Sequence, residues 1–579
     1  MHDFIGHGIN SPFTKSTAHP LLCTALIHRV RARTYKGLLT ASAVRAANQN
    51  PAGGNIKVFC ERIVGTYNLF LERLRDADVR RKAGSLLLGK MIGLAIVLFL
   101  ASKWYLPAQA FADTTPPLPP PHINAINTVW TLVAAYLVFC MQVGFVMLEA
   151  GFARSRETVN ILVEGIADTC ICGVTFWLWG FAFMFEPGTP WIGTTGFMLH
   201  GLPATYGTTG VPLLAYWVFQ YAFADTCSTV TSGAMIGRCG FVGDLLYSVG
   251  VTGFIYPIIG HWAWGPDGWL AVMNPVSFHD FAGSTVVHTI GGVISLAGAI
   301  ALGPRLGRVF KRDGGQPMKP HDLIIGATGG LILWFGWYGF NPGSTLSALD
   351  TMGIGRVSFN TTLAACSAGL TALLISYYKT EGKWDLALTV NGFLAGLVAI
   401  TCPCYWVDPE GAFLLGIGAG FVVVYGIDLL EYLRIDDPIG AVPVHAFAGI
   451  WGTLSLGLFA AGKYGAPTAT GADVSSVVTG LFYGGGLGVL KAQAIGSFSI
   501  TLATFAASMA LMYAVKATGT LRISTEGEIE GLDIHEHGFP AYPEYVVTGD
   551  DGCPKTIDDV PIGRRTGTKL PRIDIKKAS

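Results

Sequence analysis

Two histidines lie inside apolar stretches of this 579-residue chain, and each follows an aspartate by eight residues. The first pair is Asp280 and His288, and the second pair is Asp437 and His445. A glycine stands four residues after each histidine. A titratable side chain is costly to place in hydrocarbon, so such a residue usually has a function and a partner. We expect the two histidines to be partners of each other.

A pair of neutral imidazoles has a definite chemistry. Each ring carries one N–H donor and one acceptor nitrogen, so two rings in contact can share a proton and turn their outer nitrogens toward a pore. Such a pair suits a small solute that exchanges hydrogen bonds or gives up a proton, and it suits a bare metal cation poorly. The alternative is that each histidine binds a backbone carbonyl. The matched spacing favours the pore.

The composition is that of an integral membrane protein. Hydrophobic residues make up 51% of the chain and charged residues only 13%, where a soluble domain has about 25% charged residues. The 75 glycines suit closely packed transmembrane helices. The net charge is zero, and nothing indicates a nucleic-acid partner. The eleven cysteines are scattered and predict neither a disulfide framework nor a metal site.

Eleven apolar stretches are long enough to cross a membrane. They span residues 127–150, 159–185, 211–236, 241–263, 281–303, 322–340, 358–378, 385–403, 411–432, 441–461 and 490–518.

The flanking segments divide the chain further. Residues 1–83 are polar and basic, and we interpret them as a disordered extension or the product of a misassigned start. Residues 84–113 resemble a signal peptide, because basic residues, an apolar run and an A-x-A-like site follow one another; an extra transmembrane helix is the alternative. A Pro-rich linker (114–125) leads to the eleven-helix domain (126–518), and residues 519–579 form a polar tail.

The basic residues of the loops set the orientation. Loops after odd-numbered spans hold eleven Lys and Arg residues, and loops after even-numbered spans hold two. The positive-inside rule therefore places the mature N-terminus outside and the tail in the cytoplasm. The fifth span, with His288, and the tenth, with His445, run in opposite directions. Five spans, five inverted spans and a final helix are typical of an inverted-repeat transporter with its site near the membrane midplane.

Aromatic residues gather where the fourth and sixth spans approach the outer face. They include Tyr256, Trp264, Trp337 and Phe340, and Ser344 follows close by. Aromatic faces attract cations by about 0.5–2 kcal/mol each, and a hydroxyl can accept an N–H. The alternative is an interfacial aromatic belt.

These motifs resemble the ammonium transporter (Amt/Mep/Rh) family. The likeness rests on the stretches 147–152, 280–288, 340–344 and 436–445 and on tail residues 531–538, and it covers about residues 125–545. The resemblance implies an all-α membrane protein of eleven helices in two inverted halves, assembled as a homotrimer with one pore per subunit. It implies a transporter without enzymatic activity, cofactor or metal.

The resemblance also assigns residues along the outer half of the pore. Trp264 and Ser344 match the outer ammonium-recruitment site. Phe223 and Phe340 match a stacked phenylalanine gate, and Tyr256 would shape the pore mouth.

Deeper in the membrane, His288 and His445 match the family's twin histidines, and Trp337 would line the pore beside them. Asp280 matches a buried aspartate that supports the site; a simple N-cap role is compatible with that.

The expected function is ammonium transport for nitrogen uptake across the inner or plasma membrane, in contact with lipid. Ammonium would be recruited outside, lose a proton, and cross as ammonia while the proton travels along the imidazoles. The alternative is an ammonium sensor that signals through its cytoplasmic tail and transports little. Regulation by a PII-type protein at the cytoplasmic face is implied by the resemblance alone.

Several positions depart from the family pattern. Gly237 stands where the family usually has Glu, and Gly440 stands where an acid is often found. Asp225 and Asp168 lie inside spans, where they either pair with polar groups between helices or alter a proton route. The tail segment 535–537 (His-Glu-His) lacks metalloprotease spacing, and we expect it to be solvated.

Overall fold

A computed structural model describes residues 124–206, 209–468, 471–473 and 477–543. The predicted N-terminal extension, the signal-like segment, all but the end of the Pro-rich linker and the last part of the tail lie outside the described residues.

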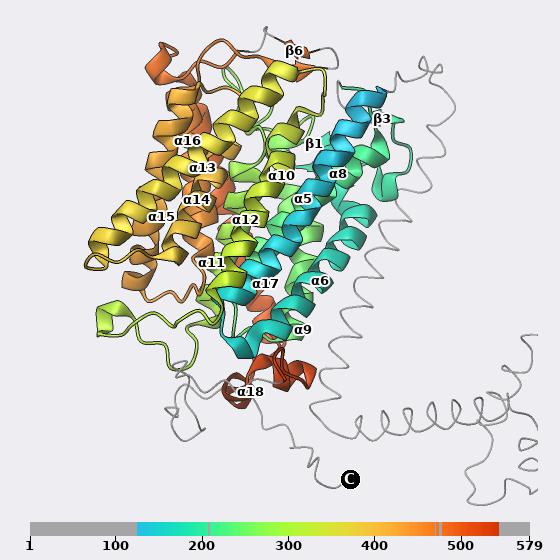
Figure 1. The fold of residues 1–579 in the computed structure, drawn as a ribbon. Helices are drawn as coiled ribbons and strands as arrows, with labels where there is room; N and C mark the ends of the chain where they lie inside the picture. Colours follow the sequence, from blue (N-terminus) through green and yellow to red (C-terminus); the bar gives the residue numbers. More distant parts are fainter. Residues whose placement is uncertain (1–123, 207–208, 469–470, 474–476, 544–579) are drawn as a thin grey trace, which may run out of the picture. The chain divides into compact units, whose positions relative to one another are not determined.

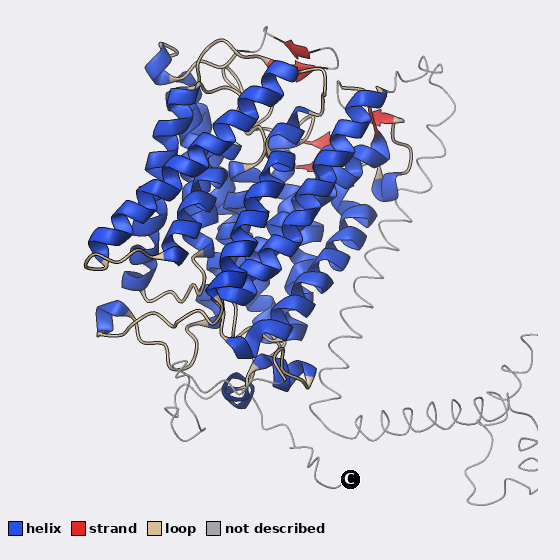
Figure 2. Cartoon of the chain, in the orientation of Figure 1, coloured by secondary structure: helices blue, strands red, loops and turns tan. Residues whose placement is uncertain are grey.

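Within these residues the chain forms eleven membrane-spanning helical segments joined by short loops and three small hairpins (Figures 1 and 2). The segments are α5 (Ala125–Phe152), α6 (Thr158–Thr175) continued by η2 (Phe176–Gly180) and α7 (Phe181–Phe185), α8 (Leu213–Ser232), α9 (Phe241–Gly250) continued by η4 (Val251–Ile255) and α10 (Tyr256–Trp264), η5 (Ser284–Thr289) with α11 (Ile290–Leu302), α12 (Leu323–Phe340), α13 (Thr351–Lys379), α14 (Leu386–Thr401), α15 (Pro409–Leu433), η8 (Val442–Phe447) with α16 (Ala448–Phe459), and α17 (Gly488–Ala517).

The remaining elements are short. They are the antiparallel hairpins β1–β2 (Gly188–Thr189, Ile192–Gly193), β3–β4 (Thr205–Tyr206, Val211–Pro212) and β5–β6 (Ala466–Thr468, Gly471–Asp473), the turns η1 (Ser155–Glu157), η3 (Phe197–Leu199), η6 (Lys311–Asp313), η7 (Pro342–Thr345) and η9 (Leu481–Tyr483), and α18 (Thr525–Glu530) with η10 (Asp533–His537) in the tail.

The eleven predicted spans are present as helices. Nine of those in the described residues are long and apolar enough to cross a membrane on their own. The other two are α14, which has 16 residues, and α8, whose second half is rich in polar side chains. Neither would be a strong candidate in isolation, and both are held by their neighbours.

Two kinds of boundary differ from expectation. The histidine-bearing helices begin at residues 284 and 442, because a bend that includes a glycine with positive φ follows each aspartate and precedes the first helical turn. Helix α13 begins seven residues before the predicted 358, because the side chain of Asp350 accepts the Gly353 N–H at 2.9 Å and caps it. The charge that interrupts this apolar run, Arg356, lies over the rings of Tyr405 and Tyr464.

Small residues allow the first helix of each half, α5 and α12, to pack against each other. A Cβ atom added at Gly151 would lie 2.2 Å from the Gly326 nitrogen, and one at Gly329 would lie 2.4 Å from the Leu148 nitrogen. Only a residue without a side chain permits such a backbone approach. These glycines therefore permit the close helix packing that the high glycine content predicted.

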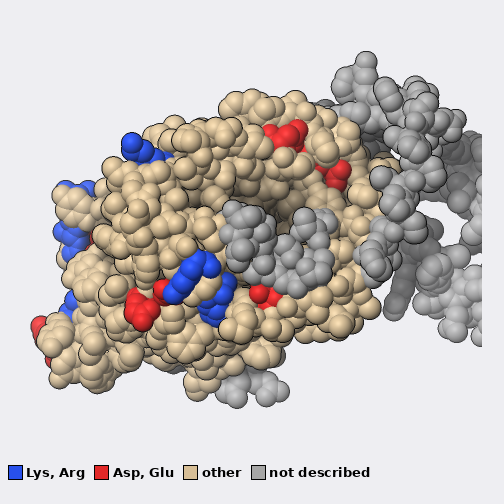
Figure 3. All heavy atoms as spheres, turned by 90° about the horizontal axis from the view of Figure 1, so that it is seen from above, with Lys and Arg blue, Asp and Glu red and all other residues tan. Residues whose placement is uncertain are grey.

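Successive spans alternate in direction. The hairpins β1–β2, β3–β4 and β5–β6 lie at one end of the bundle and α18 at the other (Figure 1). Helices α11 and α16, which follow the two histidines, accordingly run in opposite directions. Seen from the hairpin end, the surface carries scattered charged side chains and is hollowed near its middle (Figure 3).

The first part of the tail packs against the start of α6. The Arg156 guanidinium donates to the Ile529 carbonyl at 2.6 Å, and His537 Nε2 lies 3.0 Å from Asn160 Oδ1. His537 is half-buried, so the expectation that residues 535–537 are simply solvated is wrong for it. A side-chain contact with the membrane domain holds this turn in place.

Candidate transport site

The two aspartate–histidine segments have the same local structure. The Asp280 carboxylate accepts the backbone N–H groups of the residues three to six positions later, at 2.9–3.0 Å. The Asp437 carboxylate accepts those three to five positions later, at the same distances. In both segments the first of these residues is a glycine with positive φ, Gly283 at +112° and Gly440 at +81°. Each carboxylate thus caps a π-helical turn, η5 or η8, that carries the histidine.

The glycine four residues after each histidine lets the two segments touch. A Cβ atom at Gly292 would lie 2.3 Å from the Ala446 nitrogen, and one at Gly449 would lie 2.4 Å from the Ser284 carbonyl oxygen. Each glycine therefore faces the backbone of the other half's π-helical turn. This double approach brings the two rings into contact, and it explains a glycine at both positions.

The imidazoles of His288 and His445 meet through their Nδ1 atoms, which are 3.2 Å apart. Since a hydrogen bond between two such nitrogens needs one donor and one acceptor, a single shared proton suffices. His288 is fully buried and its Nε2 atom has no hydrogen-bond partner in the described part of the chain. The predicted pairing is confirmed, and the alternative bond from each ring to a backbone carbonyl is not what is observed there.

A row of aromatic rings leads from His288 toward the hairpin end. The His288 ring stacks on Trp337 and Phe340, with centroids 5.1 and 5.3 Å away. Phe340 stacks on Phe223 at 4.0 Å, and the edge of Phe223 meets Trp264 at 6.4 Å. Five residues from four spans, far apart in the sequence, thus lie in one continuous path.

Hydrogen bonds fix several residues of this row in place, and the other predicted residues lie beside it. Trp264 Nε1 donates to the Asp280 carbonyl at 2.8 Å, which ties the outermost ring to the first aspartate segment. Ser344 Oγ donates to the Phe340 carbonyl at 2.7 Å. Trp337 Nε1 donates to the Thr401 hydroxyl at 2.9 Å. Tyr256 is fully buried and makes none of the ring contacts of the row within the described residues, so it is not part of the path itself.

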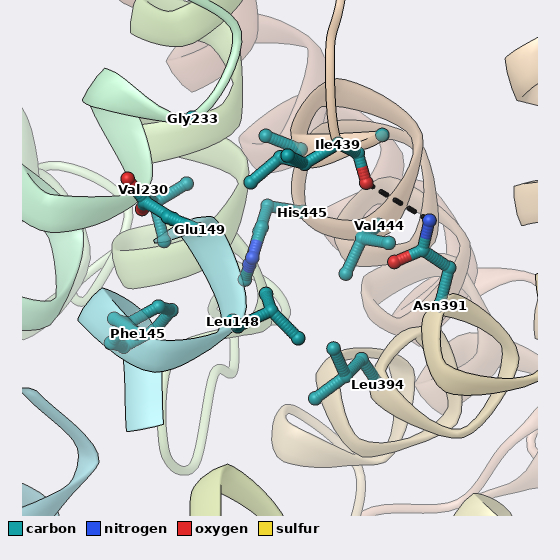
Figure 4. A pocket seen from close by; sticks show the side chains of 12 residues that line it. Phe145, Leu148, Glu149, Val230, Gly233, Asn391, Leu394, Ile439, Val444 and His445 are labelled. Carbon is teal, nitrogen blue, oxygen red and sulfur yellow. Dashed lines mark hydrogen bonds between the residues drawn. The ribbon is translucent and has the colours of Figure 1, made fainter. Parts of the chain in front are cut away.

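A small cavity opens on the opposite side of the histidine pair, toward the tail end. Its lining includes His445, Phe145, Leu148, Glu149 and Asn391, from α5, α14 and η8 (Figure 4). Most of the lining is apolar. Its polar side chains are those of His445, Asn391 and Glu149, and Glu149 brings the carboxyl group. In the sequence, Glu149 stood out only as part of a family motif. The signal that could have identified it is a single acidic residue near the end of an apolar span.

A buried ion-pair network anchors the second aspartate segment at the tail end of the bundle. The Asp436 carboxylate accepts both Nε and Nη2 of Arg305 at 2.9 and 3.0 Å, and the Asp436 carbonyl accepts Arg238 at 2.6 Å. Burial by itself would raise the pKa of Asp436, but the charges of Arg305 and Arg238 outweigh it and hold that pKa well below its usual range. The carboxylate is therefore ionised at neutral pH.

The arrangement combines a buried imidazole pair inside the helix bundle, stacked rings on one side and a cavity on the other. Within the described ranges, no group of three or more His, Cys, Asp and Glu side chains is placed to hold a metal ion. Fold and site together define a multi-pass membrane protein that conducts a small solute. The chain belongs to the ammonium transporter family, whose model, described as Ammonium Transporter Family, matches residues 129–542.

Similar proteins come from distant organisms. The chain is 42% identical over 434 residues to ammonium transporter Amt2 of Archaeoglobus fulgidus, covering 73% of this chain and 89% of that protein. It is 36% identical over 437 residues to ammonium transporter 1 member 3 of Solanum lycopersicum, covering 72% and 93%.

Solved structures also resemble it. A protein described as a sensor Amt protein is 34% identical, with a TM-score of 0.63 over 71% of this chain and 98% of that one. Candida albicans Mep2 is 26% identical, with a TM-score of 0.65 over 73% and 94%.

Proposed function

We propose that this protein recruits ammonium at the outer aromatic site, removes one proton and conducts ammonia past the twin histidines, while the proton crosses separately. The observation that carries the proposal is the 3.2 Å contact between His288 Nδ1 and His445 Nδ1 at the end of the ring path. Trp264 and Ser344 would receive the cation, and Phe223 and Phe340 would form the gate. Asp280 supports the site by capping η5.

The physical reason for separating proton and ammonia is the dryness of the path. Bringing a bare ion into such a passage costs several kcal/mol or more. Ammonium escapes most of this penalty because it can cross as a neutral molecule. Potassium resembles ammonium in size and charge, but it has no proton to lose and no N–H donor. The selectivity of the pore therefore follows from proton chemistry rather than from pore width.

The test is the double variant His288→Ala/His445→Ala in reconstituted liposomes, with current recorded during ammonium and potassium pulses. We expect the ammonium current to fall at least tenfold, because the shared-proton contact is gone. The single variant Phe359→Leu, on a side chain of α13 that is 55% exposed on the outside of the bundle, serves as the control and should conduct normally. A double variant that still excluded potassium and still carried ammonium charge would refute the mechanism.

A sensor is the second candidate, and the likeness to a protein described as a sensor Amt protein supports keeping it. A sensor with little transport would give neither a lasting current nor a lumenal pH change when the wild-type protein meets ammonium. Transport predicts both. The same recording on the wild type therefore separates the two functions.

We further propose that the protein lies in the inner or plasma membrane as a homotrimer, with its mature N-terminus outside and its tail in the cytoplasm. The loop charges support the orientation, and family resemblance supports the trimer and a PII-type partner. Labelling of a cysteine placed in the exposed Lys311–Asp313 loop, from one side of sealed vesicles, tests the orientation. Light scattering of the purified protein tests the trimer.

A further inference from the structure

A second cavity lies beside the pore, between α5, α6, α8 and α9. Four carboxyl groups line it, from Glu149, Glu164, Asp168 and Asp244. Each of these residues is at most 7% exposed. The cavity is in the half of the bundle nearer the tail, because Glu149 is close to the end of α5 and Asp244 is in the first turn of α9.

These carboxyls have no counter-charge beside them. Among the described residues, no Lys, Arg or His lines the cavity. The Asp244 carboxyl is in hydrogen-bonding contact with the Glu164 carboxyl and with Tyr247, and the Asp168 carboxyl is in contact with Ser228. Several like charges cannot all remain ionised in a shared site away from water. Some of the four groups therefore hold protons, and a protonated carboxyl can donate to its neighbour, as between Asp244 and Glu164.

Three of the four carboxyls have a hydroxyl group beside them. Ser232 Oγ lies 3.1 Å from Glu149 Oε2, and Ser228 Oγ lies 2.6 Å from Asp168 Oδ1. Tyr247 donates to Glu164 Oε1 at 3.3 Å. Since a hydroxyl can donate one proton while accepting another, these groups suit proton transfer between acids. They surround no common point at which a metal ion would bind.

The two cavities share Glu149. It lines the cavity beneath His445 and it lines the carboxyl cavity. In Figure 4 its side chain comes from α5 beside His445. Glu149 is thus the one acidic group that belongs both to the pore and to the acid cluster.

The opposite side of the cluster leads toward the tail. Glu164 Oε2 accepts Asn160 Nδ2 at 3.2 Å, and Asn160 Oδ1 lies 3.0 Å from His537 Nε2. His537 is half-buried at the surface of the membrane domain. Polar groups therefore extend from the pore wall to a titratable side chain at the tail end.

We propose that the pore branches at Glu149, so that ammonia continues along the pore while the proton leaves through the carboxyl cavity toward the tail. The inference rests on the proposed function. The ammonium N–H bond breaks and its electron pair stays on nitrogen, and the imidazoles pass the proton across the tail-side cavity to the Glu149 carboxylate. Glu149 then returns to the ionised form by passing a proton to the Asp244 and Glu164 group, which releases one to water at the tail. One ammonium thus yields one ammonia and one proton on the tail side.

The test measures current and ammonia flux on the same liposome preparations, the first by electrical recording and the second by uptake of isotopically labelled ammonium, which registers ammonia whether or not a proton accompanies it. We expect Glu149→Gln to lower the ratio of current to ammonia flux at least tenfold, because the amide cannot carry the proton. Glu149→Asp should restore much of the ratio. Glu410→Gln, at an exposed carboxyl in the first turn of α15, is the matched control and should leave the ratio unchanged.

Each outcome has a definite meaning. A Glu149→Gln protein with an unchanged ratio overturns the branch, as does one in which current and flux fall in proportion. If that variant is not folded by gel filtration, Asp244→Asn is measured in its place against the same criterion. A wild-type protein without ammonium current or ammonia flux contradicts the proposed function itself. A wild type with ammonia flux but no current contradicts the separate proton crossing of the proposed function as well as the branch, whereas a wild type with current and an unchanged ratio in Glu149→Gln contradicts the branch alone.

Discussion

The segments around His288 and His445 have the same architecture but different surroundings. Both have an aspartate cap, a glycine with positive φ, a π-helical turn and a second glycine at the crossing point. Yet His288 is enclosed by stacked rings, whereas His445 borders a cavity that contains a carboxyl group. The repeat supplies two equivalent supports, and the flanking helices place a row of aromatic rings on one side and a cavity with a carboxyl group on the other.

The different surroundings of the two histidines make the two ends of the pore distinct. The inverted repeat alone would make the two ends of the pore equivalent. Residues outside the repeat motif remove that equivalence, since the rings come from α8, α10 and α12 and the acids from α5, α6 and α9. Variants that disturb one segment and spare the other test whether the supports are equivalent and the surroundings are not.

The largest effect is expected at the crossing point. Gly292→Val places a side chain against the Ala446 backbone, which a Cβ atom would approach to 2.3 Å. The two segments must separate, so we expect ammonium transport to fall at least 100-fold in liposome assays, and Gly449→Val should behave alike. Gly355→Val on α13, where no atom lies within 4 Å of an added Cβ, is the control. Normal transport in Gly292→Val would show that close contact is unnecessary.

The next effect distinguishes the two caps. Asp280→Ala leaves four N–H groups without an acceptor in fully buried bonds, and Asp437→Ala leaves three in bonds that are only partly buried, because Asp437 itself is half-buried. At about 1 kcal/mol or more for each buried group, we expect a loss near 4 kcal/mol for Asp280→Ala and roughly half that for Asp437→Ala. Thermal unfolding in detergent measures both. Asp322→Ala, which removes a less buried cap on α12, should cost about 1 kcal/mol. Equal losses at Asp280 and Asp437 would contradict the assigned difference in burial.

A smaller effect concerns acid stability of the second segment, which alone has the neighbouring Asp436. Asp436→Asn should lower stability at pH 7 by about 3 kcal/mol, because Arg305 loses its buried partner. The folded-state pKa of Asp436 is depressed, so this stabilisation is complete above the unfolded-state value near 4 and is lost as the pH falls below it. The difference between wild type and variant should shrink below about pH 4.

Unfolding measured at pH 7, 5 and 3.5 tests this prediction. Asp313→Asn, which removes an exposed pair with Arg434, should have little effect at any of these pH values. A difference between wild type and Asp436→Asn that grew toward low pH would have the wrong sign.

The smallest effect is expected on the ring side. Trp264→Leu removes the outermost aromatic face and its bond to the Asp280 carbonyl. Since one cation–π contact is worth about 0.5–2 kcal/mol, we expect the half-saturating ammonium concentration to rise about three- to tenfold, with little change at saturation. Trp264→Phe keeps an aromatic ring, so its half-saturating ammonium concentration should lie between those of the wild type and Trp264→Leu. An unchanged half-saturating concentration in Trp264→Leu would move the recruitment site elsewhere.

The two segments that carry the histidines could largely be predicted from the sequence. The spacing of Asp280 from His288 and of Asp437 from His445, with glycine four residues on, sufficed to predict two matched segments that meet. Counting the apolar spans was enough to orient them oppositely. Both inferences depend on local hydrogen bonding and hydropathy, which a linear pattern records directly.

What surrounds the histidines was decided by the tertiary structure. The stacking of Phe223 on Phe340 was expected only through resemblance, and the carboxyl cavity was not expected at all, although Asp168 had stood out in the sequence. Glu149, Glu164 and Asp244 meet because three helices are rotated so that these side chains face one another. The tilt and rotation of a membrane helix depend on its packing against neighbours. A single span's sequence does not specify them, so contacts between spans emerge only when the bundle is assembled.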